Sequence, residues 1–231
     1  MATKRNQAVL FDLDGVIIPT ENIKGQVHAQ TVASFGGSVS PSLYVDYIGR
    51  SHEEVRWAFI TAAGMQIDPD AYTRTFRQIY HALLEADLGF SPGAGKLLDT
   101  LARRGYRLAL VSSSSASSIT LILAKLGIVG IFEAVITADD VSRKKPAPDA
   151  YLAALKQVSI SPAQAIVFED SQVGVQAAVA AGVSVIAVRH SLNYKQDFSP
   201  AYTILDSLTD TPSILKLIET IFSRTALDFA T

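Results

Sequence analysis

The sequence predicts an α/β protein built on a doubly wound parallel β-sheet, with an all-helical segment inserted after the first strand. Short apolar runs rich in β-branched residues recur along the chain, and helical stretches alternate with them. This alternation is typical of strands joined by right-handed helical crossovers. Residues 18–89 contain no convincing strand and therefore interrupt the rhythm.

Six apolar runs are predicted to be strands. They are continuous rather than alternating in polarity, which is typical of strands covered by helices on both faces. The runs span residues 8–12, 107–112, 134–137, 165–169, 183–188 and, more weakly, 202–205. The helices predicted between them span residues 95–104, 116–126, 149–158 and 174–181. Glycines at 105, 127 and 182 follow these helical stretches or stop them, as expected for helix C-termini.

The insertion is predicted to be a separate helical cap. Its helices are expected over residues 21–35, 53–63 and 70–86, whereas an ordinary crossover needs far less chain. We therefore expect a core formed by residues 1–17 and 90–231 and a cap formed by residues 18–89. Four aromatic residues of the cap are interpreted as its core: Tyr44, Tyr47, Trp57 and Phe59.

Composition excludes several classes of protein. The chain has 231 residues, 22 acidic and 20 basic, so a formal net charge of −2 argues against a nucleic-acid-coating protein. The absence of cysteine excludes disulfide frameworks, thiolate metal sites and a cysteine nucleophile. The apolar, uncharged stretch at residues 171–188 reads as a helix followed by a buried strand rather than a membrane span. We expect a cytoplasmic protein, a monomer, with no membrane or nucleic-acid partner.

Polar side chains cluster at the predicted carboxyl ends of the strands, where the active sites of open α/β sheets lie. Asp12 and Asp14 follow the first strand, Ser112 to Ser115 the second, and Glu169-Asp170 end the fourth. Such carboxylates could not lie close together without a cation, and hard oxygen donors without His or Cys indicate Mg²⁺. Serine hydroxyls and the ammonium of Lys145 suit the oxygens of a phosphoryl group.

Each of these features has an ordinary structural explanation when taken alone. An Asp-x-Asp-Gly sequence is usually a solvated turn, and serines after a strand often cap the next helix. A lysine doublet is usually a surface pair, and acidic residues before a helix complement its dipole. The four histidines, at 28, 52, 81 and 190, lack paired metal-ligand spacing and are interpreted mostly as surface or packing residues. Only the joint occurrence of these features at the predicted strand ends favours an active site.

Together, four motifs resemble those of the haloacid dehalogenase superfamily, in the same order and at similar spacing. They are Asp12-Leu-Asp-Gly-Val, Ser112 after an apolar strand, Lys145-Pro-Ala-Pro-Asp149, and Phe168-Glu-Asp-Ser-Gln-Val-Gly174. The resemblance covers nearly the whole chain. The position of the helical cap resembles the subgroup of β-phosphoglucomutase and phosphoglycolate phosphatase.

The resemblance implies a role for each motif residue. Asp12 is expected to attack phosphorus and form an aspartyl phosphate, and Asp14 to act as general acid and base. Ser112 and Lys145 are expected to bind the phosphoryl oxygens. The Mg²⁺ ligands are then expected to be the Asp12 carboxylate, the Asp14 backbone carbonyl and Asp170, with Glu169 either a direct ligand or a residue behind the ligands. Gly15 and Ser113 are expected beside the phosphate.

The cap is expected to select a small phosphorylated metabolite, such as a sugar phosphate or a phosphoglycolate-like acid. The residues expected to face it are Thr20, Glu21, Lys24, Arg50 and His52. The sequence departs from the mutase, because Lys24 occupies the position of the mutase histidine and His52 that of its cap arginine. A phosphomutase is the alternative reading. A phosphonate-cleaving enzyme and a non-catalytic binding protein are less favoured, because Lys24 is the only cap lysine and Asp12 and Asp14 are both present.

Overall fold

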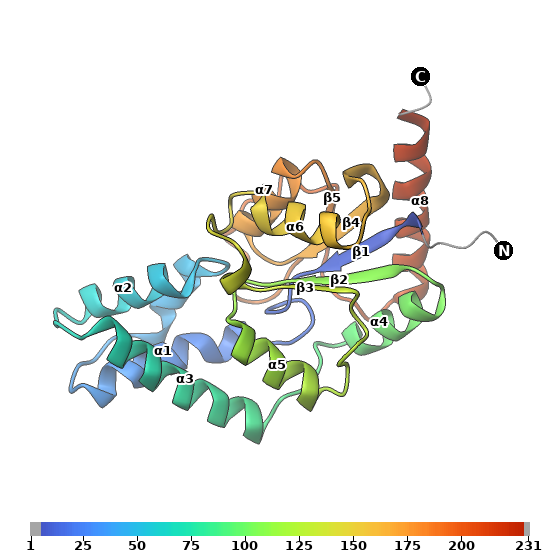
Figure 1. Cartoon of the computed structure of the whole chain (residues 1–231). Helices are drawn as coiled ribbons and strands as arrows, with labels where there is room; N and C mark the ends of the chain where they lie inside the picture. Colours follow the sequence, from blue (N-terminus) through green and yellow to red (C-terminus); the bar gives the residue numbers. More distant parts are fainter. Residues whose placement is uncertain (1–5, 229–231) are drawn as a thin grey trace.

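The computed structural model describes residues 6–228 and contains a six-stranded parallel sheet, which confirms the predicted fold class (Figure 1). The strand order is β3-β2-β1-β4-β5-β6, and every neighbouring pair is parallel. The strands are β1 (Ala8–Phe11), β2 (Arg107–Val111), β3 (Ala134–Ile136), β4 (Ala165–Glu169), β5 (Ser184–Val188) and β6 (Thr203–Leu205).

The central strands are buried because their side chains are apolar on both faces. Successive residues of β1 alternate between two hydrophobic clusters: Val9 and Phe11 belong to one, Ala8 and Leu10 to the other. Helices α4 (Ala94–Arg103), α5 (Ala116–Lys125) and α8 (Thr211–Asp228) contribute to the first cluster. Helices α6 (Asp149–Gln157) and α7 (Gln172–Ala180) cover the opposite face, so the sheet lies between two helical layers (Figure 1).

Helix α8 was not predicted from the sequence. Its buried residues, among them Ile214, Ile218 and Phe222, pack into the cluster that also contains Leu97 and Leu101 of α4. The 3₁₀ helices η3 (Ala138–Asp140) and η4 (Pro162–Gln164) are short connections on the core. No helix among residues 6–228 is both long and apolar enough to cross a membrane.

The part of the segment between β1 and β2 that precedes α4 folds into helices that lie beyond one end of the sheet (Figure 1). They are α1 (Glu21–Ser34), the 3₁₀ helix η2 (Pro41–Tyr47), α2 (His52–Ala62) and α3 (Pro69–Ala86). Ser51 and Glu54 form a capping box that fixes the start of α2. Phe59 is fully buried as expected, but Trp57 is 45% exposed, so its assignment to the cap core was wrong. Trp57 lies on the outer face of α2 and stacks with Arg56 instead.

The register of the sheet brings the predicted motif residues together. Phe11 pairs with Leu110 on one side and with Phe168 on the other. The residue after Phe11 is Asp12, whose backbone N–H donates to the Phe168 carbonyl at 2.9 Å. Side chains that follow β1, β2 and β4 therefore meet at one edge of the sheet, facing the cap.

Candidate active site

Asp12 lies in a buried ion-pair network at the end of β1. The Lys145 ammonium donates to Asp12 Oδ1 and to Glu169 Oε1, each at 2.6 Å, and all three side chains are at least nine-tenths buried. Burial raises the pKa of Asp12 to about 7, although Lys145 opposes the rise. Burial alone would lower the pKa of Lys145, but the two carboxylates hold it well above its usual value. Lys145 is therefore a fixed, permanently charged neighbour of Asp12.

Glu169 uses both of its carboxylate oxygens to organise this network. Oε1 accepts hydrogen bonds from Lys145 and from the Tyr151 hydroxyl, the latter at 2.8 Å. Oε2 accepts from the Asp170 and Ser171 backbone amides and from the Ser171 hydroxyl, each at 3.0 Å. A Cβ at Gly174 would lie 1.8 Å from Oε1, so this glycine is required for the carboxylate to fit. The geometry favours Glu169 as the support of Lys145 rather than as a direct metal ligand.

Asp14 has a different environment, because residues of the cap surround its carboxylate. Lys24 lies 2.8 Å from Oδ2, Ser114 donates to Oδ2 at 2.9 Å, and the hydroxyls of Thr20 and Tyr80 both donate to Oδ1. Burial would raise the pKa of Asp14, but Lys24 and the hydroxyl donors together lower it below its usual value. Asp14 is therefore an ionised carboxylate that can accept a proton.

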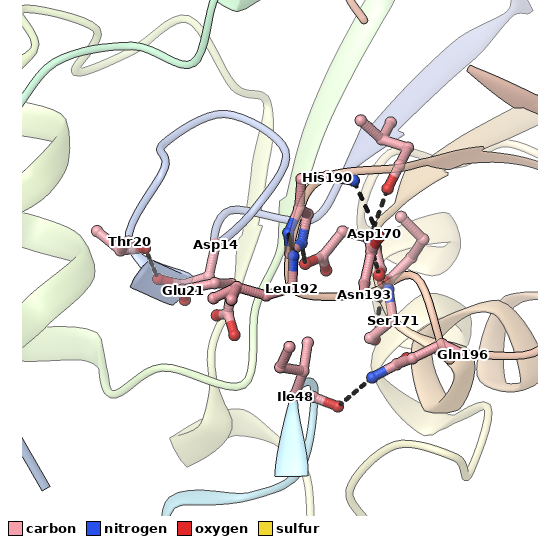
Figure 2. A network of polar contacts seen from close by, with 12 residues as sticks. Asp14, Thr20, Glu21, Ile48, Asp170, Ser171, His190, Leu192, Asn193 and Gln196 are labelled. Atoms are coloured by element: carbon pink, nitrogen blue, oxygen red, sulfur yellow. Dashed lines mark hydrogen bonds and ion pairs between the residues drawn. The ribbon is translucent and has the colours of Figure 1, made fainter. Parts of the chain in front are cut away.

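Asp170 is held by a loop that follows β5 (Figure 2). His190 Nε2 lies 2.8 Å from Asp170 Oδ2, and the Leu192 amide donates to His190 Nδ1. Because Nδ1 accepts, the proton of the neutral ring is on Nε2, facing Asp170. Asn193 donates to the backbone carbonyls of Asp170 and Val188 at 2.8 and 2.9 Å. Main chain and side chain of Asp170 are thus both fixed.

The donor groups at this edge fit a hard divalent cation. A cavity of about 20 Å³ is large enough for one water-sized species. Its lining includes four acidic residues, Asp12, Asp14, Glu21 and Asp170, and two basic ones, Lys24 and Arg50. Burial and these neighbouring anions raise the pKa of Asp170 well above its usual value, as expected for carboxylates awaiting a positive charge. Gly15, at φ 77°, admits Asp170, because a Cβ there would lie 2.0 Å from Asp170 Oδ2.

This donor set is open rather than closed. Within residues 6–228, no three His, Cys, Asp or Glu side chains enclose one point as a ready-made metal site. The expected ligand set contains only two carboxylates, from Asp12 and Asp170, together with the Asp14 backbone carbonyl. Mg²⁺ usually keeps several waters and takes one or two protein carboxylates, so an open site suits it.

A larger cleft of about 360 Å³ separates the cap from the core. Of the residues expected to contact substrate, Lys24, Arg50, His52 and Ser113 line it. Thr20 instead bonds to Asp14, and Ser112 is buried, with its hydroxyl accepting from the Ser114 amide at 3.0 Å. The cleft also contains rings and cations that were not expected at the site: His28, Tyr44, Arg56, Phe76, Arg77, Tyr80 and Lys144.

Three residues that contact the carboxylate of Asp14 or Asp170 were missed by sequence reasoning. Ser114 lies two residues after Ser112, so the serine run did carry a signal for it. Tyr80 reaches Asp14 from the buried face of α3, and only the packing of that helix reveals it. His190 has no neighbouring motif, because its partner Asp170 is on a different strand end. The last two depend on tertiary contacts that no local pattern encodes.

Comparison with known proteins places these residues in a family context. A family model described as haloacid dehalogenase-like hydrolase matches residues 9–188. The chain is 32% identical over 191 residues to the protein SUPPRESSOR OF QUENCHING 1, chloroplastic, of Arabidopsis thaliana; the match covers 80% of this chain but only 18% of that longer protein. It is 30% identical over 188 residues to the fructose-1-phosphate phosphatase YqaB of Escherichia coli K12, covering 80% of this chain and 98% of the relative.

Solved structures show the same architecture. The crystal structure of CbbY from Rhodobacter sphaeroides in complex with phosphate superposes with a TM-score of 0.80 at 26% identity. The superposition covers 88% of this chain and 95% of that one. The similarity therefore includes the helices inserted between β1 and β2 as well as the sheet.

Proposed function

The chain belongs to the haloacid dehalogenase-like hydrolase family, and from this premise we propose that it is a Mg²⁺-dependent phosphatase acting on a small phosphorylated metabolite. The substrate class is a sugar phosphate or a phosphoglycolate-like acid, and the reaction passes through an aspartyl phosphate on Asp12. The observation that carries the proposal is the pairing of two carboxylates in contrasting environments. Asp12 is locked to Lys145 in the core, whereas Asp14 is held by side chains of the cap.

Asp12 is suited to nucleophilic attack on phosphorus. An Asp12 oxygen forms a bond to phosphorus while the bond to the leaving oxygen breaks. Repulsion between two anions opposes this step, and the Lys145 ammonium, 2.6 Å from Asp12, offsets it. Glu169 holds Lys145 in place and keeps it charged. The hydroxyls of Ser112 and Ser113, which follow β2, would donate to the phosphoryl oxygens.

Asp14 is suited to proton transfer. Because its lowered pKa leaves Asp14 ionised at rest, Asp14 must take up a proton before the first step. In that step it donates this proton to the leaving alkoxide and becomes a carboxylate again. In the second step a water attacks phosphorus, the bond from phosphorus to Asp12 breaks, and Asp14 takes the water proton. The residue thus ends the cycle protonated. The donors from Thr20, Lys24 and Ser114 favour the carboxylate form that this second step requires.

The cation would be held by the carboxylates of Asp12 and Asp170 and by the backbone carbonyl of Asp14. Bound there, Mg²⁺ supplies positive charge to the phosphoryl oxygens and keeps Asp12 ionised. His190 and Asn193 orient Asp170 for this role. The support for this assignment is the raised pKa of both buried carboxylates, which a divalent charge would reverse.

The cleft supports a substrate of metabolite size. Its volume of about 360 Å³ is at the lower end of small-molecule sites, which span about 300–1,000 Å³. Its lining contains more basic than acidic residues, as suits a phosphorylated compound. The basic residues are Lys24, Arg50, Arg56, Arg77 and Lys144, and the acidic ones are Glu53, Asp70 and Asp139. The relative YqaB is named as a fructose-1-phosphate phosphatase, and the match spans 98% of its length.

A panel of phosphosugars and phosphoglycolate tests the proposal. The purified protein is incubated with each compound in Mg²⁺ or in EDTA, and inorganic phosphate is measured. We expect phosphate release that needs Mg²⁺ and that Asp12→Asn abolishes. Conversion between sugar 1- and 6-phosphates without release, stimulated by a bisphosphate, would instead identify a mutase. The absence of both reactions across the panel would contradict an enzymatic role for the site.

A further inference from the structure

Glu21, the first residue of the cap helix α1, is a buried carboxylate with one unused oxygen. Its side chain is only 5% exposed. Oε1 accepts from Lys24 at 3.0 Å, whereas Oε2 is buried and makes no direct hydrogen bond among the described residues. The Tyr44 hydroxyl lies near the Glu21 carboxyl and offsets part of the rise in its pKa that burial causes. A buried acceptor without a donor is costly, and more so when it carries charge. The structure therefore points to a donor that completes this site.

The unused oxygen belongs to a side chain that lines the small cavity at the metal-binding edge. Glu21 shares the lining of this cavity, of about 20 Å³, with Asp12 and Asp170. Figure 2 shows Glu21 beside Asp14, with Asp170 farther away next to His190. The negative charge of Glu21 also raises the pKa of Asp170, as expected for two carboxylates facing each other across a small space.

Protein cations do not neutralise this cluster. Lys24 is the cation nearest to Glu21, and it is already shared with Asp14 at 2.8 Å. Lys145 is engaged by Asp12 and Glu169. Among the described residues, the carboxylates of Glu21, Asp14 and Asp170 thus have Lys24 and the largely neutral His190 as their ion-pair partners. Arg50 also lines the small cavity, but its guanidinium pairs with Glu54.

We propose that Glu21 is a further residue of the metal site, contributed by the cap: its free Oε2 accepts a hydrogen bond from a water bound to the cation. The inference rests on the proposed function, because the cation is part of that proposal. A water-mediated contact fits better than direct ligation, since no three acidic side chains among residues 6–228 enclose one point. Mg²⁺ characteristically retains such waters. The cation then links the cap helix α1 to the core strands β1 and β4.

The test measures metal binding without substrate, because Glu21 was also expected to contact substrate. Mn²⁺ is used as the probe, and the free ion is measured by electron paramagnetic resonance during titration of the metal-free full chain. The variants are Glu21→Gln, which removes the charge, and Glu21→Asp, which keeps the charge but withdraws the oxygen by one methylene. Glu85→Gln is the matched control, because Glu85 is an exposed cap carboxylate outside both cavities.

We expect both Glu21 variants to bind Mn²⁺ about 10–100-fold more weakly than wild type, which is the usual effect of removing a residue that hydrogen-bonds to a metal ligand. Glu85→Gln should bind within about twofold of wild type, well inside that range. Wild-type affinity in Glu21→Gln would overturn the proposal. Wild-type affinity in Glu21→Asp alone would also overturn it, because only the charge and not the contact would then matter. If Glu21→Gln does not fold by circular dichroism, the Asp variant, which keeps a charge for Lys24, decides.

Asp170→Asn separates this inference from the proposed function. If wild type binds Mn²⁺ and Asp170→Asn does not, the metal site stands and the Glu21 variants test the inference alone. If Asp170→Asn binds as well as wild type, the proposed metal site fails and the inference about Glu21 fails with it.

Discussion

Replacing Lys145 by methionine removes the cation at the centre of the buried network while keeping an unbranched side chain of similar length. The substitution breaks two 2.6 Å ion pairs, to Asp12 and to Glu169, in a region where none of the three side chains is more than 9% exposed. Breaking a buried pair by removing one partner costs about 3–5 kcal/mol. An exposed pair would contribute only about 0–1 kcal/mol.

The structure places the expected loss at the lower end of this range. Glu169 keeps four other donors, from Tyr151, Asp170 and Ser171, so its charge remains solvated. Asp12, whose pKa is already raised to about 7, can take up a proton. We therefore expect the free energy of unfolding to fall by about 3 kcal/mol, which lowers Tm by about 6–12 °C in a chain of this size. Loss of charge beside the nucleophile should lower kcat/KM by about 10²–10³-fold.

The neighbouring lysine provides a matched control for this experiment. Lys144 donates only to the backbone carbonyls of Ala138 and Val141 and pairs with no buried carboxylate in the described structure. Lys144→Met should therefore change the free energy of unfolding by no more than about 1 kcal/mol. Urea unfolding followed by circular dichroism, together with phosphatase assays, measures both variants. A Lys145→Met protein as stable as Lys144→Met and as active as wild type would refute the reasoning.

Three further predictions concern the carboxylates and their neighbours. Asp12→Asn and Asp14→Asn should each lower kcat by at least about 10³-fold without unfolding the protein, as kinetics and circular dichroism would show. Because burial raises the pKa of Asp12 from 3.8 to about 7, the unfolded chain loses this proton first as pH rises. The free energy of unfolding of metal-free wild type should therefore fall relative to that of Asp12→Asn between about pH 4 and 7, by up to about 1.4 kcal/mol per pH unit. Urea unfolding measures both proteins, and equal pH dependence across that window would contradict the raised pKa of Asp12. His190→Ala should weaken Mn²⁺ binding about tenfold by freeing Asp170, and an unchanged titration would show that the contact at 2.8 Å does not orient the ligand.

Much of the fold was predictable because it depends on local patterns. The continuous apolar runs identified the strands, since burial on both faces leaves no polar alternation. Gly105 and Gly127 adopt φ values of 79° and 67°, as expected after helix C-termini. Helix α8 was not predicted, although it follows the weak strand predicted at residues 202–205. It belongs to the core because it packs against α4, a helix that is distant in the sequence.

The candidate site divides in the same way. The ends of β1, β2 and β4 could be brought together from the sequence, because parallel strands present their carboxyl ends at one edge. The hydrogen-bond and ion-pair partners of those residues could not be predicted from the sequence. Glu169 accepts hydrogen bonds from Lys145, Tyr151 and Ser171, and these contacts depend on the packing of loops. The contact between Lys24 and Asp14 depends on the packing of the cap. Motifs thus predict which groups meet, whereas the tertiary structure determines which oxygens remain free.

The measurement that tests the account most directly is the detection of a phosphoryl group on Asp12 during turnover. The protein is mixed with an accepted phosphosugar and Mg²⁺, quenched in acid within milliseconds, digested and analysed by mass spectrometry. The account predicts a phosphorylated peptide containing Asp12 in wild type and none in Asp12→Asn. Normal turnover by Asp12→Asn, with no phosphorylated Asp12 at any quench time in wild type, would contradict it.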